Sequence, residues 1–193
     1  MEETLYDHLK MLMHFECPQN MGELGPMLAL VRGKHSVLEI GSNFGGTFRR
    51  MGAELAPNSL MVSVDYPVDE TPKYLNPVGT LKLNCQKLAD NYGHRVELLI
   101  ADSHDAEIVE KVRQFGPYDF VFIDGDHTYE GVKADWTNYG PMGKVIGFHD
   151  IAGPVEGCVR FWQELKDAKL FNTEEFVTPG SGMGIGIVYR EAA

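Results

Sequence analysis

Short apolar runs alternate with longer amphipathic segments along most of this chain. The apolar runs are rich in Val, Ile, Leu and Phe, and most lack polar alternation, which is typical of parallel strands buried on both faces. They predict strands at residues 36–40, 60–64, 96–100, 118–123 and 144–148. The segments between them predict helices at residues 46–55, 78–92, 105–115 and 129–139. Such alternation is typical of a doubly wound α/β sheet with helices on both faces.

Both ends of the chain extend this core. Helical spacing of apolar residues predicts two helices before the first strand, one marked by Leu5, Leu9, Leu12 and Met13 and one at residues 21–31. A further helix at residues 156–168 precedes two strands, 171–177 and 183–189, joined by a Pro179-Gly180 turn. A turn this tight joins antiparallel neighbours, since a parallel return needs a crossover of a dozen or more residues. We therefore expect a seven-stranded sheet, mostly parallel, with an antiparallel C-terminal strand.

Length and composition fit one soluble α/β domain over residues 1–193, with residues 1–32 as an N-terminal helical lid or cap. Apolar residues make up 44% of the 193 residues, charged residues 23%, and the formal net charge is −11. Such an acidic chain repels phosphate backbones and anionic membranes, so neither nucleic acid nor a membrane is an expected partner. Residues 1–10 lack a signal-peptide pattern, and three distant cysteines suggest no disulfide framework. A cytoplasmic location is the expectation.

The strongest local signal is the segment Val37-Leu38-Glu39-Ile40-Gly41-Ser42-Asn43-Phe44-Gly45-Gly46. An apolar strand runs into a glycine-rich turn and then a helix, and open α/β sheets bind ligands outside the carboxyl ends of such strands. Dinucleotide folds use G-x-G-x-x-G here, but Asn43 takes the place of the glycine that admits a pyrophosphate. The segment therefore favours a ligand without a pyrophosphate.

Two carboxylates accompany this turn. Asp65 ends the next strand, where a carboxylate can accept hydrogen bonds from both ribose hydroxyls. The alternative for Asp65 is a helix-capping role in a loop. Glu39 lies within the buried strand, where its charge is costly unless a positive or hydrogen-bonding group meets it.

In these features the sequence resembles the class I S-adenosylmethionine-dependent methyltransferases. Glu39-x-Gly41-x-x-x-Gly45 is similar to their first motif, Asp65 to their second-strand acidic residue, and Ala101-Asp102-Ser103 to their adenine-contacting motif. The resemblance implies a Rossmann-like fold, with Glu39, Gly41 and Gly45 at the methionine end, Asp65 at the ribose, and Asp102 and Ser103 at the adenine. The cofactor contacts that it implies are Glu39, Gly41, Ser42, Asn43, Gly45, Asp65, Tyr66, Asp102, Ser103 and Asp124.

A second group of polar residues follows the fourth and fifth predicted strands. The fourth runs into Asp124-Gly125-Asp126-His127, and the fifth ends in His149-Asp150. Because the carboxyl ends of parallel strands meet at one edge, these side chains should converge on the same crevice as the glycine turn. Close carboxylates repel each other unless a proton or cation lies between them. Oxygen ligands with one imidazole suit Mg²⁺ or Mn²⁺.

This group resembles the metal-dependent small-molecule O-methyltransferases and the cephalosporin-hydroxylase-like branch of the superfamily. The resemblance rests on Ile-Asp-Gly-Asp-His, on the later His-Asp-Ile, and on the upstream segment from Pro18 to Leu24. It implies metal ligands at Asp124, His149 and Asp150, and a general base at His127. An imidazole at the place of His149 departs from the acidic residue more common there. His149 could instead be a second acid/base group or orient Asp150.

The function expected from these features is O-methylation of a small-molecule hydroxyl with a divalent metal, with Asp124, His127 and His149 as the catalytic residues. The alternatives are another enzyme on this scaffold, such as a metal-assisted hydroxylase or an N-methyltransferase, and a non-catalytic protein that binds an adenosyl ligand. The acceptor is not evident from the sequence, since Tyr66, Tyr129, Trp136 and Phe148 could line a pocket or belong to the core. The N-terminal helix could be a lid or the contact of a homo-oligomer.

Overall fold

The computed structural model describes residues 19–66, 76–180 and 183–190. The strands of these residues form one seven-stranded sheet in the order β3-β2-β1-β4-β5-β7-β6. The strands are β1 (Ser36–Ile40), β2 (Leu60–Asp65), β3 (Arg95–Ile100), β4 (Tyr118–Ile123), β5 (Gly143–His149), β6 (Asn172–Phe176) and β7 (Ile185–Tyr189). The first five are parallel, whereas β7 pairs antiparallel with both β5 and β6. The predicted fold class and the antiparallel C-terminal strand are therefore confirmed.

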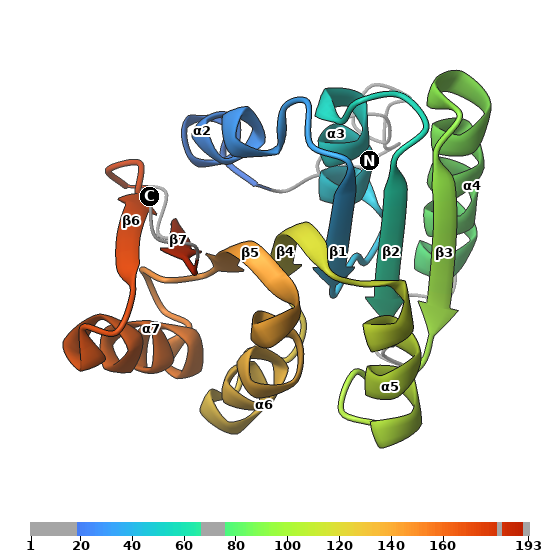
Figure 1. Ribbon diagram of the computed structural model, residues 1–193. Helices are drawn as coiled ribbons and strands as arrows, with labels where there is room; N and C mark the ends of the chain where they lie inside the picture. Colours follow the sequence, from blue (N-terminus) through green and yellow to red (C-terminus); the bar gives the residue numbers. More distant parts are fainter. Residues whose placement is uncertain (1–18, 67–75, 181–182, 191–193) are drawn as a thin grey trace, which may run out of the picture.

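Helices cover both faces of the sheet (Figure 1). On one face lie α2 (Met21–Val31), α3 (Gly46–Glu54) and α4 (Pro77–Tyr92). On the other lie α5 (Ala106–Phe115), α6 (Tyr129–Tyr139) and α7 (Glu156–Ala168), and a 3₁₀ turn, η1 (Gly140–Met142), follows α6. Each layer encloses its own cluster of buried apolar side chains against the sheet. The two hydrophobic cores hold the central strands rigidly, and with them the residues at the strand ends.

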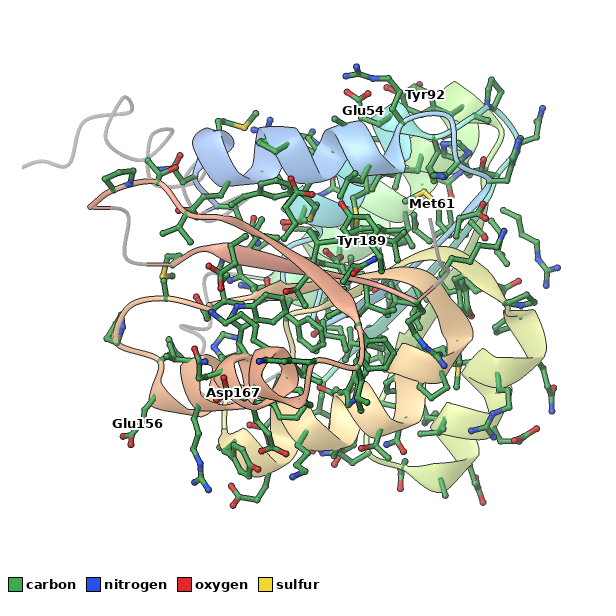
Figure 2. All side chains as sticks on the ribbon, turned by 60° about the vertical axis from the view of Figure 1, so that its left-hand side comes forward. Glu54, Met61, Tyr92, Glu156, Asp167 and Tyr189 are labelled. Carbon is green, nitrogen blue, oxygen red and sulfur yellow. The ribbon has the colours of Figure 1, made fainter. Side chains whose placement is uncertain are left out.

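The side chains fill the space between the sheet and the helices (Figure 2). Met61 on β2 is fully buried, whereas Glu156 and Asp167 at the two ends of α7 are exposed. Two of the cysteines, Cys85 and Cys158, are buried free thiols. Burial raises the pKa of Cys85 to about 11, so this thiol stays protonated at neutral pH.

Strand register sets which residues meet at the carboxyl edge of the sheet. Ile40 of β1 pairs with Val64 of β2 and with Ile123 of β4, and Ile123 pairs with Phe148 of β5. The next residue on each strand therefore lies in one row along this edge, in the order Asp65, Gly41, Asp124, His149. The chain leaves β1 toward β2 and returns to β4 on its other side, so this row spans the switch point where open α/β sheets bind ligands.

The predicted elements match the observed ones to within about two residues at their ends, a scatter expected of helix boundaries. The first predicted helix, marked by Leu5, Leu9, Leu12 and Met13, lies outside the described residues, as does Cys17. One expectation needs correction. The strand β3 is not buried on both faces, because it lies at the edge of the sheet and its first and last residues, Arg95 and Ile100, are exposed. None of the described helices has the length and apolar character to cross a bilayer.

Candidate functional site

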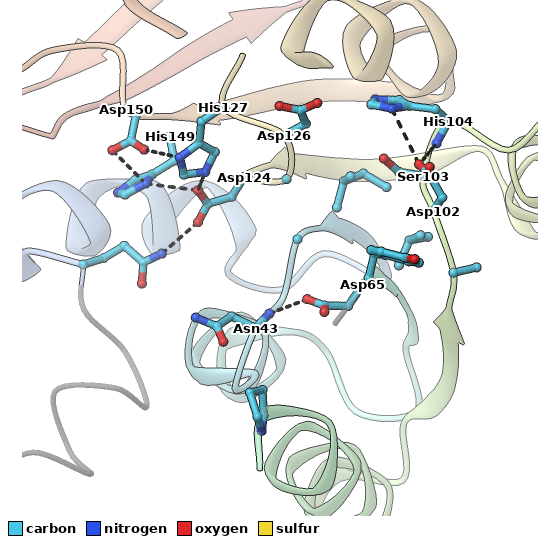
Figure 3. Close-up of a pocket in the computed structure, with 18 of the residues that line it drawn as sticks. Asn43, Asp65, Asp102, Ser103, His104, Asp124, Asp126, His127, His149 and Asp150 are labelled. Atoms are coloured by element: carbon cyan, nitrogen blue, oxygen red, sulfur yellow. Dashed lines mark hydrogen bonds and ion pairs between the residues drawn. The ribbon is translucent and has the colours of Figure 1, made fainter. Parts of the chain in front are cut away.

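A cavity of about 670 Å³ opens along the carboxyl edge of the sheet (Figure 3). It extends from the ends of β2 and β3, past the glycine turn after β1, to the ends of β4 and β5. The polar residues that line it include Gln19, Asn43, Asp65, Tyr66, Asp102, Ser103, His104, Asp124, Asp126, His127, His149 and Asp150. The residues around the glycine turn and the acidic residues after β4 and β5 therefore line a single cavity, as predicted from their positions at the ends of parallel strands.

The glycine turn folds tightly between β1 and α3. Gly41 has φ +82°, and a Cβ on it would lie 2.1 Å from the carbonyl oxygen of Asp124. Asn43 also adopts a positive φ, of 50°, and its backbone N–H donates to Oδ2 of Asp65. The Asp65 carboxylate is therefore held against the turn. Burial raises the pKa of Asp65, and the backbone hydrogen bonds from Asn43 and Ser42 counter that rise.

Three of the predicted cofactor residues do not line this cavity. Glu39 is 1% exposed and lies on the same face of β1 as Val37, toward the α2–α4 layer. Burial raises the pKa of Glu39 well above its usual range, which favours the neutral form of this side chain. The hydroxyl of Ser42 lies 2.7 Å from that of Ser63, and Gly45 takes a left-handed conformation as the N-cap of α3. The cofactor roles of these three residues stay predictions.

At the other end of the cavity, two carboxylates and two imidazoles form a compact cluster. His149 Nδ1 lies 3.1 Å from Asp124 Oδ1 and 3.2 Å from Asp150 Oδ1. His127 Nδ1 lies 3.1 Å from Asp150 Oδ2, and its Nε2 lies 3.4 Å from Asp124 Oδ1. The four side chains surround a common centre (Figure 3). We call Asp124, His127, His149 and Asp150 the acid–imidazole cluster.

Burial divides the cluster into an inner and an outer part. The side chains of His149 and Asp150 are 6% and 2% exposed, whereas that of His127 is 44% exposed. Burial alone would lower the pKa of His149, but Asp124 and Asp150 raise it to about 10. The hydrogen bond with Asp124 raises the pKa of His127 as well. The outer imidazole can therefore reach a molecule in the cavity, while the inner one is fixed between the carboxylates.

The cluster has the composition and spacing of a metal site. Ligand atoms of Asp124, His127 and Asp150 all lie within 4.8 Å of one another. Within the cluster, Nε2 of His149 is buried without a hydrogen-bond partner among the described residues. Buried polar atoms in this state are costly, and a coordinated cation would offset that cost. The sequence prediction has His149 as the third ligand, and the structure places both imidazoles against the same two carboxylates.

A buried aspartate lies behind the residues predicted to contact adenine. The hydroxyl of Ser103 donates to Asp135 Oδ1 at 2.8 Å, and His104 Nε2 lies 3.3 Å from the same oxygen. The hydroxyl of Tyr139 donates to the carbonyl oxygen of Ser103. Asp135 on α6 is fully buried, so it fixes both cavity residues from beneath.

Replacing Asp135 by asparagine is expected to make the protein more stable relative to the wild type at neutral pH than at acidic pH. Burial raises the pKa of Asp135 to about 6, so the folded state keeps a proton that the unfolded state releases near pH 4. The stability that this proton contributes is complete below about pH 4 and is lost as the pH rises through about 6. Between about pH 4 and about pH 7.5, the variant should gain roughly 1–3 kcal/mol over the wild type. Urea denaturation of metal-free protein at both pH values measures this gain. The prediction is contradicted if the difference in stability between variant and wild type is the same at both pH values.

Some lining residues were not singled out from the sequence, and some aromatic candidates are core residues. Gln19, His104 and Met183 line the cavity, but the sequence assigns no role to them, although Gln19 lies in the segment from Pro18 to Leu24 and His104 follows Ala101-Asp102-Ser103. Of the four aromatic candidates, Tyr66 lines the cavity, whereas Tyr129, Trp136 and Phe148 pack in the core cluster on the α5–α7 side. Thr128 is the N-cap of α6, since its hydroxyl accepts from the N–H of Gly131.

Comparison with known proteins finds a methyltransferase family model and structures of methyltransferases. A family model described as a methyltransferase domain matches residues 38–151, more than half of the chain. An O-methyltransferase from Bacillus cereus, solved with S-adenosylhomocysteine, superposes with a TM-score of 0.68 at 17% identity, covering 98% of this chain and 92% of that one. TomG, an O-methyltransferase of tomaymycin synthesis from Streptomyces achromogenes solved with S-adenosylmethionine, has a TM-score of 0.64 at 18% identity, covering 88% and 78%. No curated protein matches significantly in sequence. At these identities the structural likeness shows the fold.

Proposed function

This chain belongs to the methyltransferase-domain family, and on that premise we propose that it transfers the methyl group of S-adenosylmethionine to a hydroxyl oxygen of a small molecule, with a divalent metal ion. The observation that carries the proposal is the shared cavity. Asp65 beside the glycine turn and the acid–imidazole cluster line the same space, at opposite ends of one row of strand ends. A bound cofactor would therefore lie within reach of both.

The charges of the cavity support a cationic sulfonium ligand over a dinucleotide. Five carboxylates line it, those of Asp65, Asp102, Asp124, Asp126 and Asp150. No lysine or arginine is among its described lining residues. Such a surface attracts the positive sulfonium and repels a pyrophosphate. We assign Asp65 to the ribose hydroxyls, and Asp102 and Ser103 to the adenine.

Within the cluster we assign Asp124, His149 and Asp150 to the metal and His127 to proton transfer. The assignment follows burial, because a ligand can be enclosed whereas a general base has to reach the acceptor. His149 lies within the protein between the two carboxylates, and His127 is the exposed member. Carboxylate oxygens with one imidazole suit Mn²⁺ better than Mg²⁺.

When bound, the cofactor supplies an electrophilic methyl carbon, and the cation supplies a positive charge that lowers the pKa of an acceptor hydroxyl. The chain's own residues do the rest. The His127 imidazole takes the hydroxyl proton, and Asp124, 3.4 Å from its Nε2, stabilises the imidazolium that forms. Asp65 and the glycine turn orient the cofactor, so that the acceptor oxygen and the methyl group are held together rather than meeting by diffusion.

Thermal-shift titration tests the cofactor and the metal together. S-adenosylhomocysteine and NAD would each be added to the protein, with and without Mn²⁺. A ligand at 100 times its Kd stabilises by about 2.7 kcal/mol, which for a domain of this size is a shift of roughly 5–10 °C. We expect this shift with S-adenosylhomocysteine and a further one with Mn²⁺. A shift with NAD alone would overturn the proposed function, and no response to Mn²⁺ would remove the metal from it.

Replacing Asp65 by asparagine is expected to weaken binding of S-adenosylhomocysteine about 10–100-fold, because a hydrogen bond to a charged group contributes roughly 1.5–3 kcal/mol. Asparagine keeps the size of the side chain and an oxygen that can accept from the Asn43 N–H. Isothermal titration calorimetry measures the affinity. The matched control is Asp167→Asn on the exposed end of α7, which should bind as the wild type does. Equal affinities for the two variants would remove Asp65 from the ribose.

A further inference from the structure

Gln19 connects the start of α3 to the acid–imidazole cluster. Its Oε1 accepts a hydrogen bond from the hydroxyl of Thr47 at 2.5 Å, and its Nε2 donates to Asp124 Oδ2 at 3.1 Å. Thr47 lies in the first turn of α3, directly after the glycine turn, and is 6% exposed. One amide thus joins the helix that follows the glycine turn to a side chain assigned to the metal.

The two hydrogen bonds require one orientation of the Gln19 amide. An ionised carboxylate only accepts hydrogen bonds, so the side facing Asp124 has to be the NH₂ group. The carbonyl oxygen then faces Thr47, whose hydroxyl donates to it.

The bond from Gln19 also decides how the Asp124 carboxylate is turned. It engages Oδ2 and leaves Oδ1 for the two imidazoles, at 3.1 Å from His149 Nδ1 and 3.4 Å from His127 Nε2. Without it, Oδ2 would lose a donor, and rotation about the bond to the carboxylate carbon would exchange the two oxygens. A ligand carboxylate held by an outer hydrogen bond is restricted to one geometry.

The backbone around Gln19 is itself anchored. The next residue, Asn20, caps α2 by accepting from the N–H of Gly22 at 2.7 Å. Glu23, in the first turn of α2, is fully buried and accepts from the backbone N–H groups of Thr178 and Gly184, at 2.9 and 3.1 Å. Gln19 therefore extends from a helix start that is fixed to the β6–β7 connection.

We propose that Gln19 is a positioning residue, which holds the Asp124 carboxylate in the orientation that binds the metal and is itself oriented by the Thr47 hydroxyl. The inference rests on the proposed metal site and adds to it two residues from outside the acidic motifs. Its specific content is a chain of two hydrogen bonds, from Thr47 to Gln19 and from Gln19 to Asp124. Loss of either bond should therefore weaken metal binding.

The test compares four variants by their affinity for Mn²⁺, measured by calorimetry. Gln19→Ala removes both bonds, and Thr47→Val removes the hydroxyl while keeping the branched shape. Thr47→Ser restores a hydroxyl, so it should rescue the loss. Gln86→Ala is the control, since it removes a similar bond, from Gln86 to Asp90 at 2.8 Å on the exposed face of α4. Removing an outer partner of a metal ligand typically weakens metal binding about 10–100-fold.

We expect this loss for Gln19→Ala and Thr47→Val, and affinities near that of the wild type for Thr47→Ser and Gln86→Ala. Wild-type affinity in Gln19→Ala, or an equal loss in Thr47→Ser and Thr47→Val, would overturn the inference. If the wild type itself does not bind Mn²⁺, the proposed metal role fails. The positioning role is then decided by the crystal structure of Gln19→Ala, where a turned Asp124 carboxylate supports it and an unchanged one refutes it.

Discussion

Replacing His127 by alanine is expected to slow methyl transfer by about 10²–10⁴-fold, the usual contribution of a positioned general base. His127 is the member of the acid–imidazole cluster that reaches the cavity, and both of its ring nitrogens face carboxylates that stabilise its protonated form. The affinity for S-adenosylhomocysteine should change little, because Asp65 and the glycine turn lie at the other end of the cavity. Initial rates with a hydroxyl acceptor, identified from a panel by the mass of the methylated product, measure the first effect, and calorimetry measures the second.

The control for this prediction is His35→Ala, since His35 is an exposed histidine at the opposite edge of the sheet, before β1. Its turnover should equal that of the wild type. Two results would count against the assignment of His127 as the base. A collapse in S-adenosylhomocysteine affinity would make His127 a cofactor contact. A large loss of Mn²⁺ affinity would make it a metal ligand, as the spacing of Asp124, His127 and Asp150 also permits.

Replacing Gly41 by alanine is expected to destabilise the protein by more than about 4 kcal/mol, a large share of the stability of an ordinary domain. The added Cβ would lie 2.1 Å from Asp124 O and 2.5 Å from Asp124 C, and these backbone atoms cannot turn away as a side chain could. The φ of +82° adds strain for any residue with a Cβ. Urea denaturation measures the loss.

Gly180→Ala separates the two causes. Gly180 has φ +81°, almost the value of Gly41, but a Cβ on it would meet no atom of the described residues within 4 Å. This variant should therefore lose only about 1–2 kcal/mol from the left-handed conformation. If the two variants were equally stable, the close approach of β1 and β4 would not be what requires a glycine at position 41.

Much of the fold could be predicted because its strands and helices differ in pattern as well as in length. The buried runs of β1, β4 and β5 have few polar residues, and the Pro179-Gly180 turn is too short for a crossover. The burial of β3 could not be read in this way. Its apolar run resembles that of a central strand, and its place at the edge of the sheet depends on the order of the strands, which local sequence does not contain.

In the candidate site as well, some residues could be predicted from the local sequence and others could not. Asp65, Asp124 and His149 could be predicted because each stands at the end of an apolar run, and strand ends converge. The role of Gln19 could not be predicted, since its partner Asp124 is 105 positions away, and the segment from Pro18 to Leu24 supports the resemblance without indicating what this side chain contacts. Glu39 is assigned to the ligand by resemblance, and this role stays a prediction, because its buried side chain lies on the face of β1 that carries Val37 and is not among the residues that line the cavity.

The two hydrogen bonds that the Glu23 carboxylate accepts from Thr178 and Gly184 join distant parts of the chain, which matters during synthesis. Its two backbone partners are 155 and 161 positions further along the chain, so α2 is made long before its buried carboxylate can be satisfied. Closing so long a loop has an entropic cost, which grows slowly with the length of the loop. On a ribosome, the Glu23 carboxylate therefore meets its two partners only after the β6–β7 connection has left the exit tunnel, so the anchor of the helix start next to Gln19 is completed late in synthesis.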